Sequence, residues 1–238
     1  MVNAIINAAS NSTGALAPGE IVSIYGTGIG PATPAYLQVS NGTVTSITGN
    51  TRVLFDGIAA PVTYASAVQT NVIVPYGVAG RTSTNIQVEY LGVQSAAINY
   101  NVVATEPGIF SLNQSGTGPG ATLNQDGITV NSPSAPAAKG SVVAVYMTGE
   151  GQTSPGGTNG TVTPTNGSGL KKPLLGVTAA VGGLPATVLY AGSAPGLVSG
   201  VMQVNLQIPA SAPSGAAVPL QITVGNTNTQ GGITISVQ

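Results

Sequence analysis

The chain contains no histidine, no cysteine and no tryptophan among its 238 residues. Without imidazole and thiol groups it lacks the usual proton shuttles, the best protein nucleophile and the ligands of most zinc sites. The absence of cysteine also excludes disulfide bonds. We therefore expect a non-catalytic protein with no catalytic, cofactor-binding or metal-binding residues and no cofactor.

Charge is almost as scarce, because five basic and six acidic residues make up 5% of the chain and give a net charge of −1. An average soluble domain has about 25% charged residues. So few basic side chains cannot neutralise a row of phosphates, which argues against a nucleic-acid partner. No apolar run approaches the roughly 20 residues needed to cross a bilayer, so membrane insertion is not expected. The low net charge opposes association between copies only weakly.

Glycine and proline are abundant, at 34 and 17 residues, and they separate short runs rich in Val, Ile, Thr and Tyr. Such runs at regular spacing are typical of strands in a β-sandwich. No segment has the three- to four-residue apolar period of a surface helix. The sequence therefore predicts an all-β fold with almost no helix, and 42% hydrophobic residues are enough to form its core.

An internal repeat organises the chain. QTNVIVP at 69–75 matches QVNLQIP at 203–209, YGTG at 25–28 matches YMTG at 146–149, and Tyr64-Ala65 matches Tyr190-Ala191. Ordered matches of this kind indicate two copies of one structural unit. We predict two tandem immunoglobulin-like β-sandwich domains related by internal duplication. They would span residues 1–113 and 114–238, the second with an exposed Gly/Thr/Pro-rich loop at about 152–169.

Residues 17–31, APGEIVSIYGTGIGP, resemble the start of an IPT/TIG-type immunoglobulin-like domain. The chain as a whole resembles the uncharacterised C-terminal domain of Solibacter-type acidobacterial secreted proteins. The segments that carry this resemblance include APGEIV at 17–22, PGIF at 107–110, LNQDG at 123–127, TGEGQ at 148–152 and QVN at 203–205. The resemblance implies an immunoglobulin-like fold and secretion to the exterior or the cell surface, and it implies no known activity. Met1 to Ile5 lacks the features of a signal peptide, so we expect export to depend on a signal already removed or on a longer parent chain.

The leading functional hypothesis is an extracellular structural or adhesive module that self-assembles into a filament or surface layer through β-strand edges. Its predicted partners are other copies of itself or cell-surface components. Edge strands with few charged residues can pair with a strand of another chain. The first segment alternates weakly and is the predicted self-association strand, with Asn3, Ala4, Ile5, Ile6 and Asn7 as its contact residues.

Two other functions are open alternatives. The first is a carbohydrate-binding module attached to secreted enzymes, with Tyr76 and Tyr36 as ligand contacts if they are exposed rather than packed. The second is a hydrolase with a carboxylate pair, for which Glu150 and Asp126 are the candidates, although a turn carboxylate that caps backbone N–H groups fits these positions better. The segment 124–127, NQDG, resembles the opening of a calcium loop but lacks its further acidic ligands, so structural calcium is a minor alternative.

Overall fold

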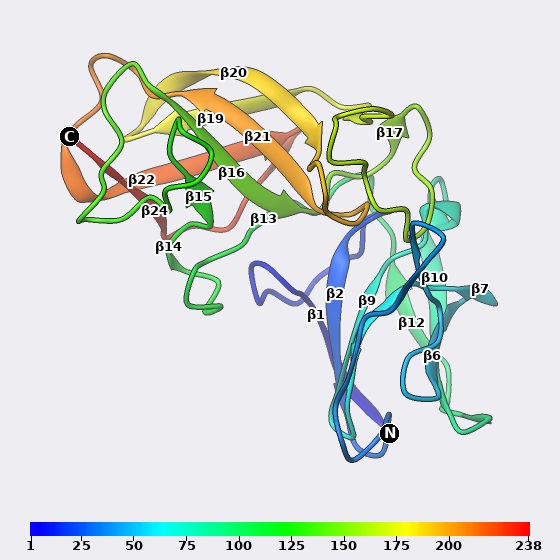
Figure 1. Ribbon diagram of the computed structural model, residues 1–238. Coiled ribbons are helices and arrows are strands. Elements are labelled where there is room, and N and C mark those ends of the chain that lie inside the picture. The colour runs from blue at the N-terminus through cyan, green and yellow to red at the C-terminus, as the bar shows by residue number, and fades with distance from the viewer.

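The computed structural model describes residues 1–238 and is all-β, as the sequence predicts (Figure 1). Its one helical element is a single 3₁₀ turn, η1 (Tyr76–Val78). None of the helical structure is long and apolar enough to cross a membrane. The Pro- and Gly-punctuated sequence therefore forms strands and turns throughout.

The N-terminal part of the chain forms two five-stranded sheets that share one core. One sheet has the order β1-β2-β9-β8-β3, and the other has the order β11-β10-β6-β7 with β12 also paired to β10. A small hairpin, β4-β5, lies outside both sheets. The strands are β1 (Val2–Asn7), β2 (Ile21–Gly26), β3 (Ala35–Tyr36), β4 (Val39–Ser40), β5 (Thr43–Val44), β6 (Thr51–Phe55), β7 (Ile58–Ala59), β8 (Val62–Ala65), β9 (Gln69–Ile73), β10 (Ser83–Tyr90), β11 (Val93–Gln94) and β12 (Ile98–Asn101).

The C-terminal part forms one ten-stranded sheet with the main order β13-β16-β21-β20-β19-β22-β24-β14, and side chains from both halves of this sheet meet in one core. A two-stranded ribbon, β17-β18, accompanies it. The strands are β13 (Gly108–Ile109), β14 (Gly118–Pro119), β15 (Thr122–Leu123), β16 (Val142–Thr148), β17 (Thr153–Ser154), β18 (Lys172–Pro173), β19 (Val177–Val181), β20 (Leu184–Ser193), β21 (Met202–Gln207), β22 (Gly215–Val224), β23 (Thr227–Asn228) and β24 (Ile233–Val237).

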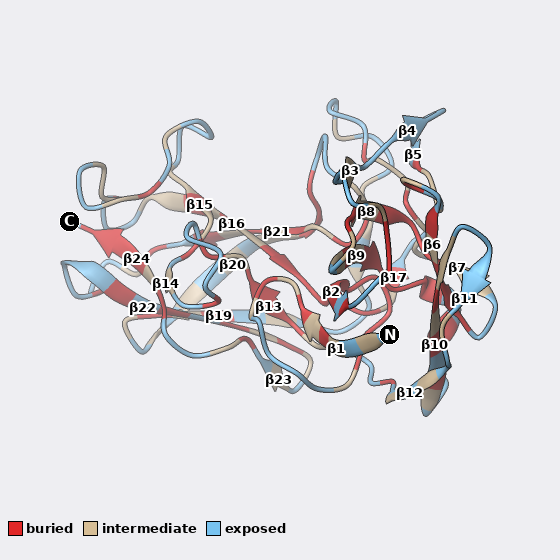
Figure 2. Ribbon diagram, turned by 90° about the horizontal axis from the view of Figure 1, so that it is seen from below, coloured by how far each residue is buried: buried red, intermediate tan, exposed pale blue.

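Most of the buried hydrophobic residues form two separate clusters, one drawn from residues 5–102 and one from residues 109–237; buried residues are red in Figure 2. Each fully buried aliphatic side chain contributes about 1.5–3 kcal/mol relative to an exposed one, so each cluster can stabilise its own sandwich. We call these parts the N-terminal and the C-terminal sandwich. The chain passes between them a few residues before the predicted boundary at 113, because β13 already pairs with β16.

The repeated sequence motifs fall on strands that pair in the same order in the two sandwiches. In the N-terminal sandwich Asn71 of β9 pairs with Ser23 of β2 on one side and with Tyr64 of β8 on the other. In the C-terminal sandwich Asn205 of β21 pairs with Ala144 of β16 and with Tyr190 of β20. This arrangement fits the predicted repeat, while the common origin of the two halves stays a prediction.

The Gly/Thr/Pro-rich loop at 152–169 is exposed over residues 154–156 and 164–166, but its middle docks on the N-terminal sandwich. The Val44 N–H donates to the Gly160 carbonyl oxygen, and the Val162 N–H donates to that of Gly42. Thr43 also forms a β-bridge with Thr161. The loop therefore joins the two sandwiches.

Candidate functional site

The predicted self-association segment is strand β1, which lies at the edge of its sheet and pairs only with β2 (Figure 1). No residue of β1 is charged. Natural proteins commonly protect such edges with lysine, proline or a covering element. In β1 the side chain of Asn3 is exposed, whereas Ile5 and Asn7 are buried. The structure thus places Asn3, Ala4, Ile5, Ile6 and Asn7 on one edge strand.

The part of this edge that is free to pair is short. The Ala8 N–H donates to the Ile21 carbonyl oxygen, and in an antiparallel ladder every second residue bonds to the same neighbouring strand. The backbone groups of Ile6 and Ala4 therefore point toward β2, and those of Ile5 and Asn7 point outward. Asn7 already uses its outward groups, with its N–H donated to Ser12 and its carbonyl accepting from Asn11. A register shift between Val2 and Ala4 interrupts the other end. Only 1% of Ile5 is exposed, so its backbone is covered as well. The accessible part of the edge is therefore limited to Asn3, which is exposed and has no partner in β2.

Tyr36 is 69% exposed and lies at the opposite edge of the same sheet. Its ring packs edge-to-face against Tyr64, with ring centroids 5.6 Å apart and an interplanar angle of 63°. Tyr64 pairs with Asn71, which pairs with Ser23. Because directly paired residues project from the same face of a sheet, these four side chains form one row across β3, β8, β9 and β2.

Tyr76 is not at the surface, contrary to its predicted role as a ligand contact, because only 5% of it is exposed. Its ring packs against Gly19 and Gly157, where an added Cβ would collide with atoms of the ring. The Tyr76 N–H donates to Asn159 Oδ1 at 2.9 Å. Tyr76 therefore packs at the junction between the N-terminal sandwich and the 152–169 loop.

Glu150 lies under this junction with 2% of its surface exposed. The Tyr76 hydroxyl donates to Glu150 Oε1 at 3.4 Å, and Glu150 Oε2 has no hydrogen-bond partner. Burial raises the Glu150 pKa to about 7, although the Tyr76 hydrogen bond and the charge of Lys171 oppose the rise. A substantial fraction of this carboxyl is consequently protonated at neutral pH.

A second buried carboxyl, Glu20, follows Gly19 directly. Its Oε2 accepts the Ala17 N–H at 2.8 Å, and its Oε1 has no partner. Burial raises the Glu20 pKa well above its usual range, and the Ala17 hydrogen bond only partly offsets this. Glu20 was not predicted as a functional residue, because a carboxylate in a Pro-Gly-Glu turn is usually exposed.

The two candidate hydrolase residues occupy different environments. Asp126 lies on an exposed turn, where its carboxylate accepts the N–H groups of Ile128 and Thr129, and hydrogen bonds led by the Thr129 hydroxyl lower its pKa. Glu150 is buried and bonded to Tyr76. No contact joins Asp126 and Glu150, and Asp126 is a turn carboxylate. No group of three or more acidic, His or Cys side chains is assembled that could hold a metal ion.

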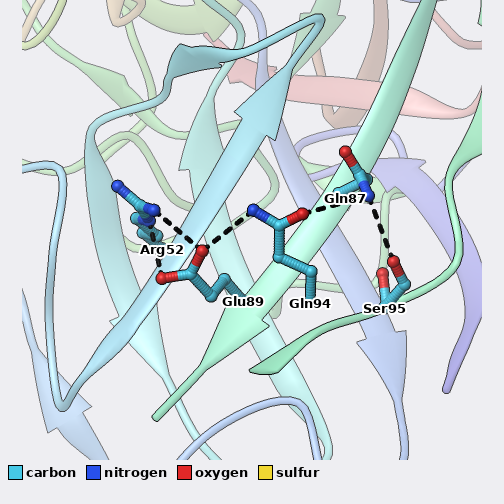
Figure 3. Close-up of polar contacts among 5 residues, drawn as sticks. All are labelled: Arg52, Gln87, Glu89, Gln94 and Ser95. Atoms are coloured by element: carbon cyan, nitrogen blue, oxygen red, sulfur yellow. Dashed lines mark hydrogen bonds and ion pairs between the residues drawn. The ribbon is translucent and has the colours of Figure 1, made fainter. Parts of the chain in front are cut away.

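Four charged side chains of the N-terminal sandwich form two ion pairs, the first of which is drawn in Figure 3. Arg52 donates from Nε and Nη2 to the two oxygens of Glu89, both at 2.8 Å, and Gln94 donates to Glu89 at 3.0 Å. A second ion pair joins Arg81 and Asp56 at 2.7 Å. Because opposite charges lie next to each other, the electrostatic field outside this surface is weak. The small number of charged residues in the chain weakens it further.

A groove of about 490 Å³ opens between the β2-β9 face and the segment that follows β13. Side chains of Ser23, Tyr25, Gln69 and Asn71 line one side, and Phe110 lies on the other. Tyr25, which was not predicted as a candidate site residue, is 37% exposed. The repeated Gln-x-Asn motif was the available signal for this groove, because it places two amide side chains on one face of a strand.

These observations define the class of the molecule: it is an all-β protein with a sandwich-like fold and two hydrophobic cores. No family model matches the chain, and no curated protein matches it. Among solved structures, one similar chain is the full extracellular region of plexin A4. The similarity covers 100% of this chain and 18% of the plexin chain, with 13% sequence identity and a TM-score of 0.30. A similarity of this size carries no information about partners or activity.

Proposed function

We propose that this chain is a non-catalytic extracellular structural or adhesive module that associates with other copies of itself through strand β1. The observation that carries the proposal is the edge position of β1, which pairs only with β2, has no charged residue and leaves Asn3 exposed and without a partner in β2. An unprotected edge of this kind can accept a strand from another copy.

The neutral surface and the joined sandwiches support this proposal. Copies of a chain with a net charge of −1 repel one another only weakly. The 152–169 loop and Tyr76 hold the two sandwiches together, which suits a structural unit that transmits its geometry to a neighbour. A typical hydrogen bond contributes about 0.5–1.5 kcal/mol net, so a short edge contact gives assembly that depends strongly on protein concentration.

Replacing Asn3 by lysine should weaken this self-association. The Asn3 side chain is exposed, so Asn3→Lys leaves the core intact while placing a like charge on each pairing edge. We expect the concentration needed for assembly to rise at least about tenfold, which corresponds to about 1.4 kcal/mol. Sedimentation velocity over a concentration series, with electron microscopy of the same samples, measures the change.

Ser168→Lys is the matched control, because Ser168 is exposed on the long loop and the variant carries the same added charge. It should assemble like the wild type. A wild type that remains monomeric at every concentration contradicts the proposal, and so does unaltered assembly of Asn3→Lys.

The second candidate function is a carbohydrate-binding module attached to secreted enzymes. The row formed by Tyr36, Tyr64, Asn71 and Ser23 favours it, since aromatic rings beside amide and hydroxyl groups suit a sugar ligand. Tyr36 remains available as a ligand contact in this arrangement, whereas Tyr76 does not.

A further inference from the structure

We infer that the groove between the β2-β9 face and the segment after β13 binds a neutral oligosaccharide. This inference rests on the second candidate function and gives that function a location and a ligand class. The groove volume of about 490 Å³ lies within the range of roughly 300–1,000 Å³ typical of small-molecule sites. Four side chains of the N-terminal sandwich, Ser23, Tyr25, Gln69 and Asn71, line its floor.

The opposite wall of the groove comes from the C-terminal sandwich and is held in place by direct contacts. The Asn11 Nδ2 donates to the Gln114 carbonyl oxygen at 2.9 Å. Gly116 approaches the turn after β1 so closely that an added Cβ would collide with the Ser10 carbonyl oxygen. The Phe110 N–H donates to the Tyr146 carbonyl at 3.1 Å, which fixes the aromatic residue of this wall. The floor and the opposite wall are therefore in place before a ligand binds, which lowers the entropy cost of binding.

The floor offers polar atoms that the protein does not use. Gln69 Nε2 donates to Asn71 Oδ1 at 2.9 Å, which fixes the two amides while leaving Gln69 Oε1 and Asn71 Nδ2 without a protein partner. The hydroxyls of Ser23 and Tyr25 also form no hydrogen bond within the protein. One amide acceptor, one amide donor and two hydroxyls thus face the groove from adjacent strands. Neighbouring hydroxyls of a sugar ring require such a mixed set of donors and acceptors.

The aromatic and uncharged character of the lining selects the ligand class. Tyr25 and Phe110 supply rings against which the C–H face of a sugar can pack. No charged side chain lines the groove, so an anionic or cationic ligand would find no counter-charge. The row of paired side chains continues from Ser23 through Asn71 to Tyr64 and Tyr36. It crosses four strands spaced about 4.8 Å apart, so the row is roughly 14 Å long. This length favours an oligosaccharide over a single sugar.

The C-terminal sandwich provides an internal comparison. Gln203 Nε2 donates to Asn205 Oδ1 at 2.8 Å, as in the groove. Ala144, however, stands at the position paired with Asn205, where the N-terminal sandwich has Ser23 paired with Asn71. The hydroxyl of Tyr190 is also already donated, to the Ser193 carbonyl. The amide pair and a tyrosine beside it, Tyr25 or Tyr146, are therefore common to both sandwiches, and only the groove adds a serine hydroxyl next to the asparagine.

Isothermal titration calorimetry on the full chain tests the inference. The protein carries Asn3→Lys so that self-association does not mask binding, and the ligands are cellohexaose, xylohexaose, mannohexaose, maltohexaose and trigalacturonic acid. At least one neutral hexaose should bind saturably, and Tyr25→Ala and Asn71→Ala should each weaken it at least about tenfold. Tyr25→Phe keeps the ring and should lose less. Asn205→Ala, the matched control, should bind like the parent.

Each contrary result overturns the inference. These results are no binding by any neutral hexaose, tighter binding of trigalacturonic acid, or an equal loss in Asn205→Ala and Asn71→Ala. Thermal unfolding of every variant separates lost binding from lost folding. A negative result in this titration does not contradict self-association through β1, because that proposal is tested by sedimentation of the wild type. A wild type that does not self-associate likewise does not contradict ligand binding in the groove.

Discussion

Replacing Glu150 by glutamine is expected to stabilise the protein at pH 8 and to leave its stability near pH 4 almost unchanged. Burial raises the Glu150 pKa from 4.5 to about 7, so the folded state retains a proton that the unfolded chain releases. The free energy of unfolding therefore falls as the pH rises from about 4.5 to about 7, and the loss then levels off. The two pKa values correspond to a total loss of about 3 kcal/mol. Glutamine cannot ionise and keeps a polar group beside the Tyr76 hydroxyl.

Urea unfolding at pH 4, 6 and 8 measures this difference. Glu89→Gln is the contrasting control, because hydrogen bonds from Arg52 and Gln94 lower the Glu89 pKa and its ionised form is the one favoured in the folded state. That variant should show no gain at pH 8. Glu20 is also buried with a raised pKa, so part of the decline should remain in Glu150→Gln. A decline in Glu150→Gln as steep as in the wild type would contradict the role assigned to Glu150.

Replacing Gly149 by alanine is expected to cost about 2–5 kcal/mol of stability. Gly149 has φ +83°, a left-handed conformation that costs a non-glycine residue roughly 1–2 kcal/mol. An added Cβ would also collide with the Glu106 carbonyl oxygen and approach the Pro107 Cα to 3.0 Å, and forcing atoms into such a packed site costs typically 1–3 kcal/mol more. Both contacts lie in the connection between the two sandwiches, so the backbone there must shift.

Gly57→Ala separates the two contributions. Gly57 has the same φ of +83°, yet an added Cβ there would meet nothing within 4 Å. We expect Gly57→Ala to lose only the conformational part, about 1–2 kcal/mol. Urea unfolding monitored by circular dichroism provides both values. Equal losses in the two variants would show that the close approach at Gly149 is unimportant.

Local sequence was enough to predict the strands and at least one turn. Pro and Gly punctuation with short β-branched runs predicted an all-β chain, which is confirmed. The Asp56-Gly57 pair is a sequence typical of a tight turn, and it connects β6 to β7 with positive φ values of 47° and 83°. Such signals are readable because the turn conformation depends on the residues within it.

Long-range packing was not predictable in the same way. Tyr76 is buried because Gly19 and Gly157, far away in sequence, leave room for its ring. Tyr25 borders a groove because the segment around Phe110 forms the opposite wall. The alternation of β2 shows which residues share a face, but it does not show what lies opposite that face. The location of the candidate site therefore depended on the tertiary structure.

Amide hydrogen exchange at Asn3, measured by nuclear magnetic resonance over a range of protein concentrations, tests self-association most directly. Asn3 is exposed and has no partner in β2, so a strand from a second copy would protect its amide. We predict that its exchange slows at least about tenfold as the protein assembles, and that Asn3→Lys abolishes this slowing. An Asn3 amide that exchanges at one rate at all concentrations, in samples that do assemble, would show that the copies meet through another surface.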